Sequence, residues 1–199
     1  MPVLAGSYNI NAVTLYSTEG RGIVDLKAIY EKIDIFESIL STCVTGIITV
    51  TDTHNLISGL NYSLPIMGNE VLYLELELPS YWYQDEFDNW KLGNPNVVTF
   101  YGRVTDVKRR TLVNEGAQNY EIHFCSEEYI TDRNIKVSKS YPQMTLGDTL
   151  SSIFTSSFPN TISSWEFAQT AGTKTTVIPN WNPLKAINWL ASRAISAAY

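Results

Sequence analysis

The chain has 199 residues, of which 44% are hydrophobic and 17% charged, and its formal net charge is −6. High apolar content with modest net charge excludes a disordered chain, and the acidic balance argues against a general nucleic-acid binder, because phosphate binding needs clustered Lys and Arg. Val, Ile and Thr together supply 50 residues and the aromatic types 24, which favours a mainly β protein.

The first part of the chain is typical of strands joined by turns. We expect strands over residues 10–16 and 23–36, and a third strand over 43–51 with a bulge at Gly46. Residues 52–59 predict one or two helical turns, because Asp52 or Thr53 can cap the start and Gly59 can end the last turn.

The middle of the chain contains the clearest strand. In residues 71–78, leucine alternates with more polar types, which indicates a half-buried strand with one solvated face. Further strands are expected over 97–109 and 119–125, with a turn at 114–116. Strands at this spacing, joined by Gly and Asn turns, predict an antiparallel barrel or sandwich.

The last third predicts helices. Apolar residues recur at helical spacing from Leu146 to Phe154, with Thr145 as the cap, and again from Leu184 to Ile195 after Pro183. The second pattern remains apolar up to the last residue, and we therefore expect a longer parent chain.

Charge divides the sequence in two. Residues 1–134 hold 18 acidic and 9 basic side chains, whereas residues 135–199 hold 2 and 5. We therefore predict a β-barrel domain over 1–134, followed over 135–199 by the beginning of a second α/β domain.

The search for catalytic residues returns no strong candidate. His54 and His123 lack metal-ligand spacing, and Cys43 and Cys125 are expected to be buried free thiols, although Cys125 lies two residues after His123. No catalytic residue, cofactor site or metal site is predicted, and we expect that the protein is not an enzyme.

Acidic and basic groups were also weighed as sites. Glu75 and Glu77 share one strand face and could form the carboxylate pair of a glycosidase, yet such residues ordinarily keep a sheet face soluble. The basic run Lys108–Arg110 is expected to be a solvated strand end or to form salt bridges with an acidic partner.

The aromatic, acidic segment 79–96 exceeds an ordinary hairpin loop in length. We interpret it as an assembly arm, since aromatic residues are enriched at interface hot spots. Two alternatives stay open: the rings cap one end of the barrel, or they form a sugar-binding platform. The candidate assembly interface comprises Tyr81, Trp82, Tyr83, Phe87 and Trp90.

Several segments, taken in order, resemble the N-terminal part of a baseplate hub protein of contractile-tailed bacteriophages. These segments are IYEKIDIFESILSTCVTGIITVTDTHNLI (29–57), LPIMGNEVLYLELELP (64–79), FYGRVTDVKRR (100–110), YEIHFCSEEYITDRNIKVSKSY (120–141) and NWNPLKAINWLASRA (180–194). The resemblance covers most of the chain and depends on the ordered series rather than on a single motif.

The resemblance implies an antiparallel β-barrel of the tail-tube type and a structural virion protein. Such hubs are homotrimers that connect the tail tube to the central spike, and each subunit carries two tube-like barrels. The implied partners are therefore the chain itself, tail-tube or tube-initiator proteins, and the spike protein. DNA would pass through the assembled channel without stable binding.

The resemblance also implies a location, and it leaves two other functions to consider. The protein is expected in the tail baseplate of the virion, and in the host cytoplasm during assembly, without membrane insertion. Members of the family are longer than 199 residues, so the second barrel is absent here. The alternatives are a β-sandwich carbohydrate-binding module and a peptidoglycan hydrolase that uses Glu75 and Glu77.

Overall fold

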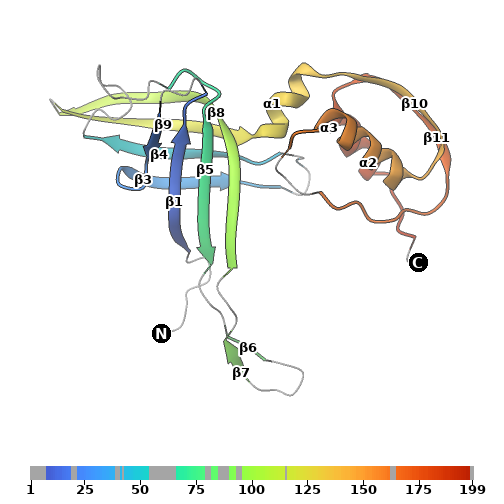
Figure 1. Ribbon diagram of the computed structural model, residues 1–199, viewed down its shortest axis with the longest axis horizontal. Helices are drawn as coiled ribbons and strands as arrows, with labels where there is room; N and C mark the ends of the chain where they lie inside the picture. The colour runs from blue at the N-terminus through green and yellow to red at the C-terminus, as the bar shows by residue number, and fades with distance from the viewer. Residues whose placement is uncertain are drawn as a thin grey trace. The chain divides into compact units, whose positions relative to one another are not determined.

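The computed structural model describes most of the chain, and it is mainly β. The described residues are 8–18, 22–38, 41, 43–53, 66–78, 82–84, 90–92, 96–114, 116–161 and 165–197. Seven strands form one sheet in the order β2–β1–β5–β8–β9–β4–β3 (Figure 1). Their bounds are β1 (Asn9–Tyr16), β2 (Ile23–Asp25), β3 (Tyr30–Phe36), β4 (Thr45–Asp52), β5 (Val71–Leu78), β8 (Asn96–Asn114) and β9 (Ala117–Ser126).

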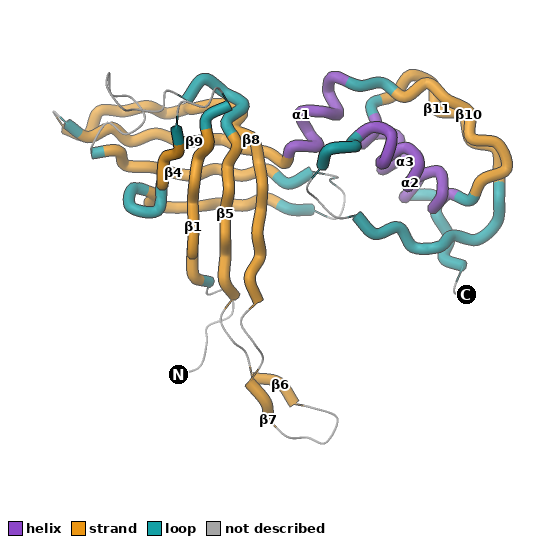
Figure 2. Tube along the Cα trace, viewed as in Figure 1, coloured by secondary structure: helices purple, strands orange, loops and turns teal. Residues whose placement is uncertain are grey.

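This sheet is antiparallel and curls around a single apolar core. Figure 2 shows β1, β5 and β8 running across the direction of β9, β4 and β3. Side chains that alternate along the strands point into the core, and among them Leu72 and Leu74 of β5 are 0% exposed. The other core residues include Val13, Leu15, Ile48, Val50, Val104, Tyr120, Ile122 and Phe124. The predicted antiparallel barrel-type architecture is confirmed, as a curled sheet with β2 and β3 at its two edges.

The segment 23–36, predicted as one strand, forms two strands. A turn over residues 27–29 separates β2 from β3, and the carbonyl of Leu26 accepts from the N–H groups of Ile29 and Tyr30 at 3.0 and 2.9 Å. Leu26 and Ile29 are both buried. Apolar residues three positions apart can both point into the core from a turn. The partial alternation of the sequence did not reveal this turn.

Gly46 of β4 marks a close approach between strands. A Cβ atom at this position would overlap the ring of Phe124 and would lie 2.6 Å from the carbonyl oxygen of Asp34. Only glycine fits here without movement of its neighbours. Asp52 is the last residue of β4, and most of the expected helical turn at 52–59 lies outside the described residues.

The remaining elements form an α/β arrangement. Strands β10 (Val137–Met144) and β11 (Lys174–Trp181) pair antiparallel, and they accompany the helices α1 (Glu127–Asn134), α2 (Leu146–Ser157) and α3 (Pro183–Ala191). A second core joins them, in which Ile153, Ile178 and Leu190 are almost fully buried. Among the described residues, no helix is long and apolar enough to span a membrane.

Two helix starts in this region are capped by side chains. The Oγ1 of Thr145 accepts from the N–H of Asp148 at 3.1 Å, as the sequence predicts for α2. At α3 the N-terminal residue Asn182 makes no side-chain cap, and Asp132 of α1 supplies one, since its Oδ1 accepts from the N–H of Leu184 at 2.7 Å. Helix α1 thus supports the first turn of α3 from a distant part of the sequence.

The last helix is shorter than the sequence pattern predicts. It ends at Ala191, and both Ala194 and Ile195 lie beyond it, with Ile195 71% exposed. The expectation of a helix continuing to the last residues is therefore wrong. The prediction extended the helix because the apolar spacing continues past Ala191 and the alanine-rich sequence there contains no residue that signals a helix end.

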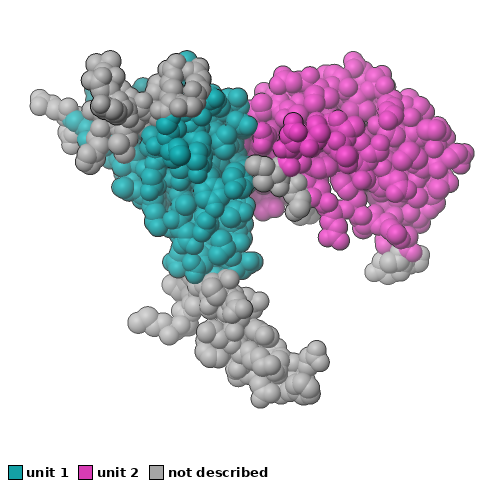
Figure 3. Space-filling view, in the orientation of Figure 1, with its two compact units in different colours: residues 1–34, 46–124 teal, residues 35–45, 125–199 magenta. Residues whose placement is uncertain are grey.

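Two compact units result, coloured teal and magenta in Figure 3. Unit 1 comprises Met1–Asp34 and Gly46–Phe124, and unit 2 comprises Ile35–Thr45 and Cys125–Tyr199. The chain passes between the units at the peptide bonds 34/35, 45/46 and 124/125. The change in charge balance near Asn134, from which the sequence analysis drew its domain boundary, coincides with the end of α1 and not with the unit boundary at 124/125. Charge balance reflects the composition of the surface, whereas the units are defined by contacts of the backbone.

We predict that Gly46→Ala lowers the free energy of unfolding by about 1–3 kcal/mol, the usual cost of overpacking. The physical reason is the overlap with Phe124 and the Asp34 carbonyl. Urea denaturation measures this change. Gly116→Ala is the control, since no atom lies within 4 Å of the added Cβ there. Equal losses in the two variants would contradict the close approach.

A second prediction concerns the cap on α3. Asp132→Ala should cost about 1 kcal/mol of stability, the typical value of a lost cap, while Asp132→Asn keeps an oxygen acceptor and should cost less. Burial raises the pKa of Asp132, more than its bond from Leu184 lowers it. The folded state then holds the proton more tightly than the unfolded state, so this group makes stability fall as pH rises through the raised pKa.

Denaturation midpoints measured between roughly pH 3 and pH 6 test this pH dependence. The stability of wild type relative to Asp132→Asn should decline with rising pH over that window. An increase would show that hydrogen bonding, rather than burial, dominates the pKa.

Candidate functional site

The segment predicted as an assembly arm contains a hairpin of its own. Strand β6 (Trp82–Gln84) pairs antiparallel with β7 (Trp90–Leu92), and among the described strands this pair is a separate two-stranded sheet. The hairpin lies in the connection between β5 and β8, whose own pairing ends at Leu78 and Asn96. Trp82, Tyr83 and Trp90 lie in these short strands, whereas Tyr81 and Phe87 lie outside the described residues.

Apolar side chains are exposed where β5 and β8 lead into this connection. Leu78, Val97 and Val98 are 44%, 49% and 42% exposed. Val97 lies opposite Glu77 in the strand register, and Val98 opposite Leu76. Exposed apolar residues grouped at the end of a strand pair are more typical of a contact surface than single scattered ones.

The solvated face of β1, β5 and β8 carries a tyrosine pair. Tyr73 of β5 lies directly opposite Tyr101 of β8, and their ring centroids are 5.0 Å apart. Tyr16 of β1 lies on the neighbouring strand, opposite Val71. Cross-strand aromatic pairs of this kind stabilise a sheet and leave their hydroxyl groups available for polar contacts.

A hydrogen-bonded carboxylate network adjoins the tyrosine pair. The hydroxyl of Tyr73 donates to Oε2 of Glu75 at 2.6 Å, and Nδ2 of Asn11 donates to Oε1 of Glu75 and Oε2 of Glu77 at 3.2 and 3.1 Å. A register shift in β1 between Ile10 and Ala12 occurs at Asn11. One amide therefore links both carboxylates that the sequence analysis considered as an acid–base pair.

This network fixes the charge of Glu75. The hydrogen bond from Tyr73, followed by the one from Asn11, holds the pKa of Glu75 below its ordinary value. In return, the bond to this carboxylate raises the pKa of Tyr73 to about 12. A glycosidase needs one carboxyl group with a raised pKa as the general acid. The pKa of Glu75 is lowered instead, so its carboxylate stays charged and can bind a hydrogen-bond donor or a cation.

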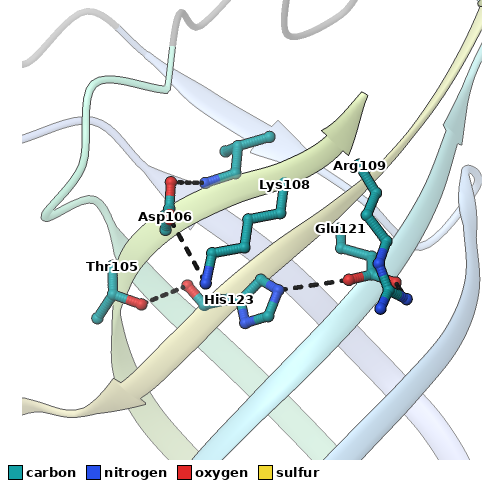
Figure 4. A network of polar contacts seen from close by, with 7 residues as sticks. Thr105, Asp106, Lys108, Arg109, Glu121 and His123 are labelled. Carbon is teal, nitrogen blue, oxygen red and sulfur yellow. Dashed lines mark hydrogen bonds and ion pairs between the residues drawn. The ribbon is translucent and has the colours of Figure 1, made fainter. Parts of the chain in front are cut away.

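The basic run Lys108–Arg110 lies within β8, which continues to Asn114, so the expectation of a strand end there is wrong. The run has partners within the chain (Figure 4). Nζ of Lys108 lies 3.6 Å from a carboxylate oxygen of Asp106, and a guanidinium nitrogen of Arg109 lies 2.7 Å from Oε1 of Glu121. The guanidinium of Arg110 lies 5.5 Å from the ring centroid of Tyr120. Groups within the chain thus partly neutralise the positive charges that would be needed to bind the phosphates of a nucleic acid.

The cysteines and histidines do not form a nucleophile site. Both cysteines are free, with Cys125 buried and Cys43 half-buried, and burial raises the pKa of the Cys125 thiol to about 11, with a smaller contribution from Cys43. A reactive cysteine requires a lowered pKa. Nε2 of His123 lies 3.4 Å from Oε2 of Glu121, and His54 lies outside the described residues. Among the residues the structure describes, no group of three or more His, Cys, Asp or Glu could hold a metal ion.

Sequence reasoning identified Glu75 and Glu77 but missed the groups that control them. Asn11 reaches them from β1, more than sixty residues earlier, through a bulge that polar alternation does not show. The sequence analysis did not single out Tyr73 or Tyr101. Their pairing depends on the register of β5 with β8, which a single sequence does not determine.

We predict that Tyr73→Phe raises the pKa of Glu75 toward its ordinary value, and that Glu75→Gln lowers the pKa of Tyr73 from about 12 toward 10.0. Carbon NMR titrations of the Glu75 carboxyl and the Tyr73 ring measure both shifts. A lowered folded pKa gives stability above the ordinary carboxyl pKa that is lost as pH falls through the folded value, so Tyr73→Phe should also reduce acid sensitivity.

Tyr101→Phe is the matched control, because Tyr101 contacts Tyr73 without a hydrogen bond to Glu75. It should leave the pKa of Glu75 nearly unchanged. Equal effects of the two tyrosine variants would show that ring packing, rather than the hydroxyl, sets the charge of the carboxylate.

Comparison with known proteins places the fold. No family model matches the sequence, and no curated protein matches it. Among solved structures, the chain is similar to the 43 kDa tail protein of prophage MuSo2 from Shewanella oneidensis, with 12% identity and a TM-score of 0.52, over 92% of this chain and 49% of that one. It is also similar to a chain of the half-lidded PdpA–VgrG complex of Francisella, with 12% identity and a TM-score of 0.50, over 94% of this chain and 28% of that one.

The chain thus spans less than half the length of either solved structure. At this identity the likeness concerns the fold alone. The curled antiparallel sheet and the α/β elements form a fold similar to that of the prophage tail protein.

Proposed function

We propose that the chain is the N-terminal part of the baseplate hub of a contractile phage tail, a structural virion protein that connects the tail tube to the central spike. The observation that carries this proposal is the match to the prophage tail protein over 92% of the chain. A match of that extent covers residues of both compact units.

Exposed strand edges support an assembled state. Ile23 of the edge strand β2 is 64% exposed, and Ile35 and Phe36 of the edge strand β3 are also exposed. Apolar edge strands promote unwanted pairing in an isolated monomer. In a ring of subunits, neighbouring copies would cover these edges. We infer a homotrimer from the resemblance to phage hubs, and the exposed edges agree with such an assembly.

The charge distribution supports a structural role beside DNA rather than a binding role. Residues 1–134 hold twice as many acidic as basic side chains. Lys108 and Arg109 of the basic run are paired with Asp106 and Glu121. A channel lined by such subunits would let DNA pass, because tight phosphate binding requires several free cations.

The described chemistry favours a protein without hydrolase activity. The lowered pKa of Glu75 opposes a general acid, and the raised pKa of Cys125 opposes a thiolate nucleophile. The carbohydrate-binding alternative depends on rings at 81–90 whose side chains lie outside the described part of the structure, and no described observation favours it.

We further propose that segment 79–96 is an arm that contacts a neighbouring tail protein, either a second copy, a tube protein or the spike. Its hairpin has its own pairing, and exposed Leu78, Val97 and Val98 adjoin its base. An arm of this kind would contribute aromatic anchors to an interface without supporting the sheet core.

The proposed stoichiometry can be tested in solution. Light scattering on the parent chain together with its spike partner should report three copies of this protein. Three copies are expected because the phage hubs that the sequence resembles are homotrimers, and neighbouring copies would cover the sheet edges. A chain that remains monomeric at micromolar concentration, and that does not enter purified baseplates, would contradict the hub assignment.

The arm makes a separate prediction. Replacing both Trp82 and Trp90 by Ala should block incorporation into baseplates, since truncated interface anchors typically cost about 2 kcal/mol or more each. The melting temperature of the isolated chain should remain nearly unchanged. Lys91→Ala, at the residue after Trp90 in β7, is the control and should assemble normally. A large drop in melting temperature would mean that the rings stabilise the fold instead.

A further inference from the structure

The outer face of β5 and β8 presents acidic and aromatic side chains together. Along β5 the outward residues include Tyr73, Glu75 and Glu77, and all three are half-buried. In the strand register Tyr101 and Val97 of β8 lie opposite the first and the last of them, and both are exposed. We call these five residues, together with Asn11, the acidic face.

The charges of the acidic face are held in position before any partner arrives. Asn11 donates to both carboxylates, and Tyr73 donates to Glu75. Lys27 donates to the carbonyl oxygen of Asn11 at 2.9 Å, and neither carboxylate forms an ion pair with a described residue. Two carboxylates beside one ammonium group leave the face with a net negative charge, which favours a basic partner.

The hairpin between β8 and β9 has the complementary character. Beyond the basic run Lys108–Arg110, Leu112 and Val113 of β8 are 77% and 59% exposed. Consecutive residues of a strand point to opposite faces, so neither face of the hairpin is covered at this point. We call residues 108–113 the basic tip.

The ion pairs of the basic tip within its own chain are compatible with a further contact. Lys108 pairs with Asp106, and Arg109 pairs with Glu121, yet the side chains of both cations are more than half exposed. Exposed ion pairs contribute little to stability, so a carboxylate of a partner can share or replace them at little cost.

One strand carries both surfaces. The first part of β8 pairs with β5 and bears Val97 and Tyr101, whereas its last residues form the basic tip. Figure 1 shows the beginning of β8 and the hairpin that joins it to β9 in different parts of unit 1, so the basic tip does not reach the acidic face of its own chain. Two complementary surfaces at different places on one unit fit a head-to-tail contact between copies, and such contacts generate closed rings or open filaments.

We propose that the basic tip of one copy docks on the acidic face of a second copy. The two carboxylates would face the cations of the tip, and the exposed leucine and valine of the tip would pack against the ring of Tyr101. The inference rests on the proposed function for the size of the ring, which three copies would close, whereas the contact itself follows from the two surfaces.

Charge reversal tests this contact in the 199-residue chain, with sedimentation velocity as the measurement. We expect the wild-type chain to self-associate as its concentration rises. Glu77→Lys and Arg110→Glu should each weaken the association about tenfold, because each replaces attraction with repulsion. The variant with both changes should regain most of the association, since the attraction returns with its sign reversed.

The two single variants control for the effect of net charge. Glu77→Lys makes the chain less acidic, Arg110→Glu makes it more acidic, and the variant with both changes has the wild-type net charge. A response to net charge alone would move the association in opposite directions in the two single variants. That result, or a double variant as weak as the single ones, would overturn the proposal.

Photo-crosslinking tests the contact without altering any charge. The photoreactive p-benzoylphenylalanine in place of Val113 should crosslink to β5 or to the first part of β8 in a second copy, which mass spectrometry of mixed isotope-labelled and unlabelled chains identifies. The same replacement at Val177 of β11, which is 61% exposed, is the control and should not crosslink there. Crosslinks from position 113 to other segments only, or none between copies, would overturn the proposal.

The contact and the hub assignment fail separately. Baseplates that hold three copies and assemble normally with Arg110→Glu would agree with the hub assignment and overturn this contact. A chain that crosslinks from position 113 to β5 of a second copy, yet does not enter baseplates, would support the contact and contradict the hub assignment.

Discussion

A sheet with one apolar face must remove that face from water, and in unit 1 the sheet does so by curling on itself. No helix occurs among the described residues of unit 1, since the helices α1, α2 and α3 all belong to unit 2. The inward residues of β5, β9 and β4 therefore pack on one another across the curl, and Tyr120, Ile48 and Leu72 are fully buried. The close approach of Gly46 to Phe124 follows from the same requirement, because strands that curl tightly leave no room for a side chain between them.

The outer face of this sheet is then free for other roles. It carries the Tyr73–Tyr101 pair and the carboxylates of Glu75 and Glu77, which Asn11 links. Hydrogen bonds within the face fix the charge of Glu75. A surface with preset charges and half-exposed aromatic rings is suited to recognition, since little reorganisation is needed when a partner arrives.

Much of the fold follows from local patterns in the sequence. Strand β5 has the bounds that its alternating leucines predict, and Thr145 caps α2 as expected. The patterns fail where burial is not periodic. Leu26 and Ile29 are buried at a turn inside a segment whose pattern predicted one continuous strand. Helix α1 buries Glu128 alone, so its sequence carries no helix signal.

The candidate sites were harder to predict, because they depend on distant residues. The network around Glu75 needs a bulge in β1, and the acidic face needs the alignment of β5 with β8. Both arise from strand register, which composition and spacing do not determine. The aromatic residues of segment 79–96 could be named from the sequence, but local patterns do not determine what they contact.

The division of the chain into discontinuous units has a mechanical consequence. Three backbone connections, at 34/35, 45/46 and 124/125, join unit 1 to unit 2, rather than one linker. A single proteolytic cut at any of these positions leaves two covalent connections intact. A pulling force applied across the units would be shared among three backbone connections.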